Sequence, residues 1–203
     1  MEDFMSLICG FDEAGRGPLA GPVTAGCVIL PKDFPVDLLN DSKKLSEKKR
    51  IAAEKVIMEK ACWGLGVVDH ETIDQMNILR ASMYAMSIAY QMMRAKLPDW
   101  LRSQNIEFDE GKLDGMISAI TDGTSCPEVP CACRCEPKAD GKYPEVMAAS
   151  IIAKVERDKM MVEFDKLYPQ YGYAKHKGYP TAAHIAVCRE IGMSPIQRKT
   201  FKF

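Results

Sequence analysis

The chain has 203 residues, of which 47% are hydrophobic and 27% are charged. This length and balance suit one globular domain with a sizeable core and exclude a disordered or fibrous chain. The 27 Lys and Arg residues against 28 Asp and Glu give a net charge of −1, which excludes a protein that grips nucleic acid through an overall basic field. No apolar run approaches the ~20 residues that cross a bilayer, so we expect a soluble, cytoplasmic protein that associates with no membrane.

Positive charge gathers in two stretches of the chain. The first lies between residues 43 and 50, and the second runs from residue 175 to 203, where six Lys or Arg residues accompany a single acid, Glu190. Charge alone favours a solvated helix face or tail for each stretch. If the stretches meet nucleic acid, they would contact phosphates and make binding sensitive to salt. The first stretch contains Lys43, Lys44, Lys48, Lys49 and Arg50.

Eight cysteines are many for a chain of this length. Four stand alone in apolar surroundings, where a thiol behaves as a small hydrophobic side chain, and they indicate a reducing compartment. The other four form a C-x4-C-x-C-x-C run that lacks the paired C-x2-C spacing of structural zinc sites. We expect a thiol-rich loop there, with a zinc or redox role as the alternative. The run consists of Cys126, Cys131, Cys133 and Cys135.

The first elements predicted are two strands and a helix. Residues 6–11 and 23–30 are apolar segments separated by glycines and prolines, so we expect a hairpin that opens a sheet. Ser46, followed by an acid and by apolar residues at helical spacing, predicts the N-cap of a helix. Residues 62–68 are the next strand candidate.

The second half of the chain alternates helices and strands. Apolar residues at helical spacing over 77–96 predict a mostly buried helix that ends at Pro98, and the polar residues 102–115 predict a loop or a frayed helix end. A short strand over 116–121 precedes a long helix that opens at Pro144 and a last helix over about 181–191. Such interleaving, without repeats or a linker, predicts one mixed α/β domain.

The most distinctive local sequence is GFDEAGRGPLAGPV, residues 10–23, which places Asp12 and Glu13 side by side where a strand meets a run of glycines. Neighbouring strand residues point to opposite faces, so both carboxylates can share a site only if the backbone leaves the pleat there. Two carboxylates held together repel each other unless a cation neutralises them. Mg²⁺ and Mn²⁺ prefer such oxygen ligands. The alternative is that Asp12 caps a turn and Glu13 is solvated.

Two further acids, Asp122 in TDG and Asp140 in KADGKYP, stand beside glycine after apolar segments. This context presents a side chain at the mouth of a sheet. If these carboxylates converge with the first two, they would build a two-metal site, which aligns a water and stabilises the leaving oxygen in phosphodiester cleavage. Linear spacing alone does not establish that they converge.

Taken together, these blocks resemble type 2 ribonuclease H, the ribonuclease HII enzymes. The resemblance covers nearly the whole chain, and several long blocks in the family's order are more specific than any single motif. One departure is the cysteine run after Asp122, where the family often has Asn and a proline-containing loop. The matching blocks are GFDEAGRGPLAGPV (10–23), DSKKL (41–45), NIL-x-AS (77–82), TDG (121–123), KADGKYPEVMAASIIAKVERD (138–158) and YGYAKHKGYPTAAH (171–184).

The resemblance implies a set of catalytic residues that hold two divalent ions, Mg²⁺ or Mn²⁺. It also implies that a glycine-arginine-glycine turn tests the 2′-hydroxyl of RNA through backbone groups, since only close backbone approach can reach it. A tyrosine would stack at the RNA–DNA junction, with a core aromatic as its alternative role. The metal ligands would be Asp12, Glu13, Asp122 and Asp140, and the substrate-binding residues Gly15, Arg16, Gly17, Lys43, Lys177 and Tyr179.

We therefore expect an α/β, ribonuclease H-like fold: a central mixed β-sheet flanked by helices, built by residues 1–203 as a single catalytic domain. Residues from about 170 to 203 would form a short helical C-terminal segment that binds substrate. The expected substrates and partners are RNA/DNA hybrids, cleaved in the RNA strand, and DNA duplexes incised 5′ to single ribonucleotides, with 3′-hydroxyl and 5′-phosphate ends.

We also expect a monomer, and the tail QRKTFKF fits a sliding-clamp-binding peptide poorly. Two other hypotheses remain. A catalytically inactive module that binds hybrids would keep the basic stretches and the glycine turn. A metal-dependent hydrolase of small phosphates would explain the carboxylates alone.

Overall fold

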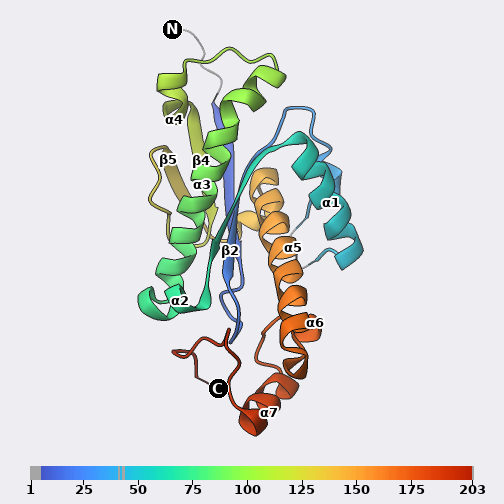
Figure 1. Cartoon of the computed structure of the whole chain (residues 1–203). Coiled ribbons are helices and arrows are strands. Elements are labelled where there is room, and N and C mark those ends of the chain that lie inside the picture. The colour runs from blue at the N-terminus through green and yellow to red at the C-terminus, as the bar shows by residue number, and fades with distance from the viewer. Residues whose placement is uncertain (1–5, 41, 43, 203) are drawn as a thin grey trace.

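The computed structural model describes residues 6–40, 42 and 44–202, and its centre is a five-stranded sheet (Figure 1). The strands are β1 (Leu7–Ala14), β2 (Val23–Ile29), β3 (Cys62–Val68), β4 (Ile117–Asp122) and β5 (Ala132–Glu136). They lie in the order β3-β2-β1-β4-β5. β2 pairs antiparallel with β1 and β3, whereas β4 pairs parallel with β1 and β5. The predicted mixed sheet and its opening hairpin are confirmed.

Helices cover both faces of this sheet. In chain order they are α1 (Glu47–Lys60), α2 (His70–Met76), α3 (Ile78–Ser103), α4 (Leu113–Met116), α5 (Pro144–Leu167), α6 (Tyr173–His176) and α7 (Ala182–Ile191). Figure 1 shows α3 and α5 on opposite faces of the sheet. Alternate side chains of β2 point to opposite faces, so this strand contributes to two hydrophobic cores. Ala25 and Cys27 pack with α3, and Val28 packs with α1 and α5. Gly26 lets α5 lie directly on the sheet, since a Cβ there would come within 2.4 Å of the Ala149 carbonyl oxygen.

Three helix starts agree with those predicted from the sequence. The Ser46 side chain accepts a hydrogen bond from the Lys49 N–H before α1. The Thr181 side chain accepts one from the His184 N–H before α7. Pro144 lies in the first turn of α5, where a missing N–H costs nothing. The cap at Ser46 and the proline at Pro144 were therefore sufficient to locate two of these starts, and the structure adds a side-chain cap at the third.

Helix α3 continues through Pro98, which we expected to end it. A proline inside a helix removes one backbone hydrogen bond and costs about 3 kcal/mol. Leu97 and Leu101 are fully buried against the sheet, and burying each stabilises the fold by roughly 1.5–3 kcal/mol. Packing thus outweighs the proline, and the predicted end was wrong. No helix in the described part of the chain, α3 included, combines the length and the apolar character needed to cross a membrane.

Part of the cysteine run forms a strand rather than a loop. Cys133 and Cys135 lie in β5, which pairs with β4 at the edge of the sheet. Pairing with a neighbouring strand overrides the weak local preference of this segment, so the expected loop was wrong here. All eight cysteines are free thiols. Among the described residues, no three thiols lie close enough to form a metal site.

Residues 170–202 pack at one end of the sheet, at the bottom of Figure 1. Their apolar side chains cluster with the end of α5 and with Ala20 from the glycine-rich loop after β1. Backbone hydrogen bonds of 2.8 Å join Leu19 N–H to the Gly178 carbonyl and Arg198 N–H to the Leu19 carbonyl. The C-terminal segment is therefore joined to the glycine-rich loop. The cluster consists of Ala20, Met161, Tyr171, Tyr173, Cys188 and Ile196.

Candidate metal centre and nucleic-acid interface

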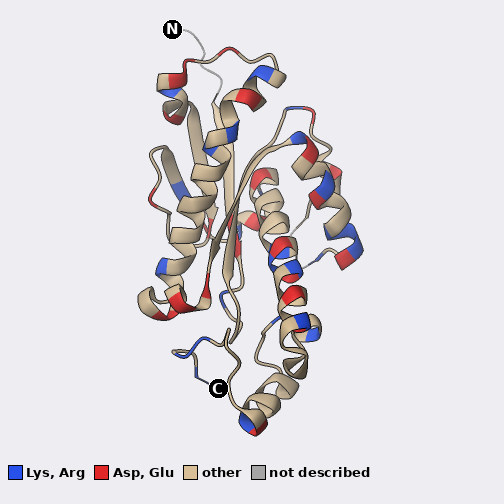
Figure 2. Ribbon diagram, in the orientation of Figure 1, with Lys and Arg blue, Asp and Glu red and all other residues tan. Residues whose placement is uncertain are grey.

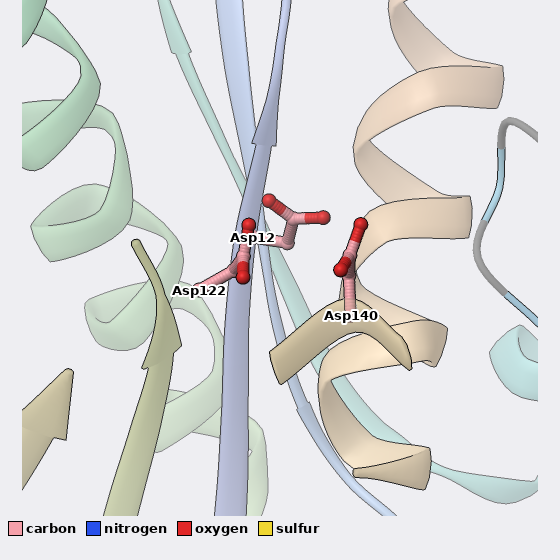
Figure 3. Close-up of side chains that lie close together, drawn as sticks. All are labelled: Asp12, Asp122 and Asp140. Atoms are coloured by element: carbon pink, nitrogen blue, oxygen red, sulfur yellow. The ribbon is translucent and has the colours of Figure 1, made fainter. Parts of the chain in front are cut away.

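The parallel pairing of β1 and β4 brings two carboxylates to the same edge of the sheet. Phe11 pairs with Thr121, so Asp12 and Asp122 follow side by side. Asp140 approaches from η3 (Ala139–Gly141), a 3₁₀ turn just before α5. One carboxylate oxygen from each of the three residues lies within 4.8 Å of the others, and the side chains point toward one another in Figure 3. These residues come from three separate parts of the chain and form one acidic cluster.

A hydrogen bond joins the two elements that carry Asp122 and Asp140. The Asp122 Oδ1 atom accepts a 2.8 Å bond from the Ala139 N–H. Ala139 is itself fully buried and packs against Ile120 and Val146. This small apolar contact holds the turn against the end of β4, so Asp140 is fixed by packing as well as by the chain.

Burial makes the cluster electrostatically costly in the absence of a cation. Desolvation raises the pKa of Asp12 well above its usual range, and the charges of Glu13 and Asp122 raise it further. Hydrogen bonds from the Ser150 hydroxyl and from the Glu13 N–H partly oppose this rise in pKa. A nearby divalent cation would offset the repulsion, and a set of carboxylate oxygens suits hard cations. The cluster therefore fits a divalent metal site.

Glu13 lies beside this cluster but outside it. The β1–β2 ladder continues through Asp12, Glu13 and Ala14, so the pleat is unbroken and neighbouring side chains diverge. The Asp12 side chain is buried within the cluster, with 5% of the residue exposed. The Glu13 side chain instead pairs with Arg16, with its Oε1 atom 3.3 Å from a guanidinium nitrogen. Glu13 still lies close enough for its charge to raise the pKa of Asp12. Three of the four predicted ligands converge, and the fourth is their neighbour.

The glycine-rich turn and Tyr179 lie next to each other. A Cβ placed on Gly17 would lie 3.7 Å from the Tyr179 ring, and Arg16 and Gly17 are both exposed. The Tyr179 side chain is 40% exposed, which rules out the alternative of a core aromatic. Two cationic groups lie near its ring: the Lys154 Nζ atom is 5.8 Å and the Arg157 Cζ atom 6.0 Å from the ring centroid. Gly15, the first residue of the turn, is buried. An aromatic surface thus borders the exposed backbone of Arg16 and Gly17.

Of the two lysines predicted to bind substrate, the structure describes only Lys177. Lys43 lies outside the described residues. Lys177 is half-buried and has a positive φ of 52°, and its ammonium group donates a hydrogen bond to the Ala174 carbonyl. Its backbone carbonyl accepts from Arg157. Lys177 therefore belongs to the turn that carries Tyr179.

The basic stretches are only partly available to a ligand. Figure 2 shows Lys and Arg interspersed with acids along α1, where Lys48 and Lys49 are exposed. In the C-terminal stretch, Lys199 and Lys202 are exposed. Arg198 is 0% exposed and donates to backbone carbonyls. The expectation that this whole stretch meets phosphates was wrong for Arg198, whose charge serves the protein's own backbone.

Sequence reasoning missed two residues that shape the site. Ser150 reaches Asp12 and lies 2.7 Å from the Ser42 hydroxyl. Arg157 lies in the buried face of α5, four residues after Ala153 and four before Met161, both fully buried. That four-residue spacing was the available signal, since an arginine in a buried helical stripe needs buried partners.

Comparison with known proteins agrees with this geometry. The family model of Ribonuclease HII matches residues 9–203. A ribonuclease HII of Treponema denticola is 46% identical over 199 residues, covering 96% of this chain and 98% of that protein. A ribonuclease HII of Dechloromonas aromatica is 44% identical over 198 residues, covering 97% of this chain and 91% of that protein.

Solved structures give the same result for the fold. The RNase HII of Archaeoglobus fulgidus, solved in a complex with PCNA, superposes with a TM-score of 0.66 at 25% identity, covering 97% of this chain and 96% of that one. Bst-RNase HIII in complex with Mn²⁺ shares the fold, with a TM-score of 0.56 at 19% identity, covering 94% of this chain and 64% of that one. The expected ribonuclease H-like fold is confirmed. The chain therefore belongs to the ribonuclease HII family and is a metal-dependent endonuclease.

Proposed function

We propose that this enzyme hydrolyses the RNA strand of RNA/DNA hybrids and incises duplex DNA on the 5′ side of single embedded ribonucleotides. The products would carry 3′-hydroxyl and 5′-phosphate ends. The observation that carries the proposal is the convergence of Asp12, Asp122 and Asp140 at one edge of the sheet. An exposed glycine turn follows directly from the strand that bears Asp12, so a nucleic-acid backbone could contact both.

The carboxylates would hold two divalent ions, Mg²⁺ or Mn²⁺. Such ions, when bound, supply an activated water and stabilise the 3′-oxygen that leaves. Asp12, Asp122 and Asp140 would provide the converging ligands, and Glu13 would complete the set from the neighbouring position on β1. The Ala139 N–H holds the Asp122 carboxylate, and the Ser150 hydroxyl supports Asp12, so the residues are oriented before substrate binds.

Recognition of the ribose would belong to the turn of Gly15, Arg16 and Gly17. The 2′-hydroxyl is the group that separates RNA from DNA at one nucleotide. The exposed backbone of Arg16 and Gly17 can approach it closely, because Gly17 has no side chain. Tyr179 would pack against the deoxyribose on the DNA side of the junction. Lys43 and Lys177 would contribute positive charge near the phosphates.

Residues from about 170 to 203 would act with the catalytic sheet as one substrate-binding unit. Their contacts with the glycine-rich loop place Tyr179 beside Gly17. We propose that a single chain suffices, because the carboxylates, the glycine turn and Tyr179 all belong to one protomer.

A comparison of four substrates tests the proposal. The purified enzyme, with Mg²⁺ or Mn²⁺, would be given an RNA/DNA hybrid, a DNA duplex with one ribonucleotide, the matched all-DNA duplex and a nucleoside monophosphate. We expect cleavage of the hybrid, a single nick 5′ to the ribonucleotide, and no reaction with the other two. Product ends would be assigned by testing whether a polymerase extends the nick and whether a ligase accepts the 5′ end.

The rival hypotheses give different results. A binding module would retain the hybrid in a gel-shift experiment and leave it uncut at every metal concentration. A hydrolase of small phosphates would release phosphate from the monophosphate. Cleavage of the hybrid without a nick at the single ribonucleotide would remove the second half of the proposal and leave the first.

A further inference from the structure

Two buried arginines bind the inner side of the glycine-rich loop. Arg157 and Arg198 are 1% and 0% exposed. Arg157 donates hydrogen bonds to the carbonyls of Pro22 and Ala20, at 2.8 and 3.2 Å. Arg198 donates to a longer series of carbonyls in the same loop: Gly15 (2.7 Å), Gly21 (2.9 Å), Pro22 (3.0 Å) and Arg16 (3.1 Å).

Neither guanidinium has the usual partner of a buried arginine. Within residues 6–40, 42 and 44–202, no carboxylate lies within ion-pair distance of Arg157 or Arg198. Burial lowers the pKa of both groups, that of Arg157 to about 10 and that of Arg198 to about 9, and the charge of Arg157 adds to the effect on Arg198. Holding two like charges together in the interior is costly. The carbonyl dipoles of the loop compensate for part of that cost.

The direction of these hydrogen bonds determines the direction of the neighbouring N–H groups. In a trans peptide, the carbonyl of one residue and the N–H of the next point in opposite directions, and the described chain has no cis peptide. Because the Gly15 and Arg16 carbonyls point inward to Arg198, the N–H groups of Arg16 and Gly17 point away from it. Both residues are exposed. Neither N–H donates to a backbone carbonyl anywhere in the described part of the chain.

The Gly21 N–H illustrates the same relation between a carbonyl and the next N–H group. The Ala20 carbonyl points inward to Arg157, so the Gly21 N–H should point outward. It donates to the Ile196 carbonyl at 2.9 Å. In the loop, the C-terminal segment therefore accepts from the N–H groups of Leu19 and Gly21. Those of Arg16 and Gly17 point away from Arg198 in the exposed part of the turn, beside the Tyr179 ring.

We infer that Arg198, with Arg157 beside it, is a positioning residue that aims the N–H groups of Arg16 and Gly17 at the substrate. This inference rests on the proposed role of the glycine turn in testing the 2′-hydroxyl. Arginine is suited to the task because its planar guanidinium offers several donors in a fixed arrangement. A lysine ammonium keeps the charge but cannot hold four carbonyls along one loop. The ligand addressed is the ribose 2′-oxygen or the phosphate next to it.

Binding without divalent metal tests this inference separately from cleavage. In EDTA, fluorescence anisotropy would give the Kd of two duplexes that differ only by one ribonucleotide. We expect the wild-type protein to prefer the ribonucleotide-containing duplex. In Arg198→Met and Arg198→Lys the preference should fall by about tenfold, which corresponds to about 1.4 kcal/mol. This lies within the net range of a hydrogen bond, about 0.5–1.5 kcal/mol. The Kd of the all-DNA duplex should change less.

Ile196→Ala is the matched control. It removes a buried side chain from the same C-terminal segment and leaves the guanidinium in place, so it should lower Tm while keeping the preference. A wild-type preference that persists in Arg198→Lys and in any folded Arg198→Met overturns the inference, and so does an equal loss in Ile196→Ala. If Arg198→Met fails to fold, Arg198→Lys alone decides. A wild-type protein without preference would instead contradict the proposed role of the turn.

Discussion

The carboxylate of Asp122 is bound by the backbone of the residue that precedes Asp140. Its Oδ1 atom accepts a 2.8 Å hydrogen bond from the Ala139 N–H. The same carboxylate has an oxygen within 4.8 Å of carboxylate oxygens of Asp12 and Asp140. Asp122 thus has two separable properties: an acceptor that anchors the turn and a negative charge for a cation. An asparagine keeps an acceptor of the same shape and removes the charge.

Asp122→Asn should therefore abolish cleavage and leave the fold intact. Loss of one carboxylate from a metal site removes several kcal/mol of transition-state stabilisation, so we expect kcat to fall about a thousandfold or more. Asp12→Asn should give the same loss. Initial rates on an RNA/DNA hybrid in Mg²⁺, together with the near-ultraviolet circular dichroism of each variant, would measure both effects.

Asp99→Asn is a suitable control for these two variants. Asp99 is an exposed acid of α3 paired only with Arg102, at 2.7 Å, among the interactions of the described residues. It should retain full activity. If Asp122→Asn or Asp12→Asn turned over the hybrid at the wild-type rate, the acidic cluster would not be the catalytic site.

Divalent metal should stabilise the protein through the same cluster. A ligand that binds only the folded state at a hundred times its Kd adds about 2.7 kcal/mol, and each kcal/mol raises Tm by about 2–4 °C for a chain of this length. We expect Mn²⁺ to raise the Tm of the wild-type protein by about 5–10 °C, with a much smaller rise in Asp12→Asn. Thermal scans across a Mn²⁺ series, begun from EDTA-treated protein, would show it. An equal rise in both proteins would place the metal elsewhere.

Local sequence patterns predicted most of the elements because caps and apolar spacing act over a few residues. Ser46, Thr181 and Pro144 mark helix starts that the structure contains. Pro98 shows the limit of such patterns, since the burial of Leu97 and Leu101 decides the end of α3, and burial depends on residues that are distant in sequence.

The composition of the acidic cluster could not be predicted from local sequence patterns. Asp12 and Glu13 are neighbours in sequence, yet an unbroken strand separates their side chains. The convergence of Asp12, Asp122 and Asp140 depends on the parallel pairing of β1 with β4, and it was expected only through the resemblance to a family. Arg198 looked like part of a charged tail because its acceptor at Gly21 lies 177 residues away.

Tyr179→Ala should impair incision at a single ribonucleotide more than cleavage of a long hybrid. An aromatic side chain that stacks on a base contributes about 1–3 kcal/mol, and we expect a loss of this order when the exposed ring beside Gly17 no longer packs on the deoxyribose. On the single-ribonucleotide duplex we expect kcat/KM to fall about tenfold or more. A long hybrid offers many alternative registers and should lose less.

Tyr179→Phe is the control, because it keeps the ring and removes the hydroxyl. It should behave like the wild type on both substrates. Equal losses of kcat/KM on the two substrates in Tyr179→Ala would take the junction role away from this residue.

The turn that carries Tyr179 should loosen as pH falls, because His176 is held neutral. His176 Nε2 lies 2.8 Å from the Tyr171 carbonyl and Nδ1 accepts from the Gly178 N–H at 3.2 Å. These partners assign the proton to Nε2. Burial lowers the pKa of His176 below its usual 6.5, and nearby His184 and Lys177 lower it further, against the opposing effects of Tyr171 and Asp165. Protonation would remove the acceptor that holds Gly178.

The lowered pKa of His176 makes the folded protein less stable at acidic pH. Below about pH 6.5 the unfolded chain binds a proton at this position while the folded chain does not, so the free energy of unfolding decreases as pH falls toward the lowered pKa. One group contributes at most about 1.4 kcal/mol per pH unit, and less here because the ring is only half-buried and solvent screens it. Urea denaturation between pH 7.5 and 5 should show this slope in the wild type and a smaller one in His176→Gln. Identical slopes in the two proteins would mean that His176 does not couple the turn to pH.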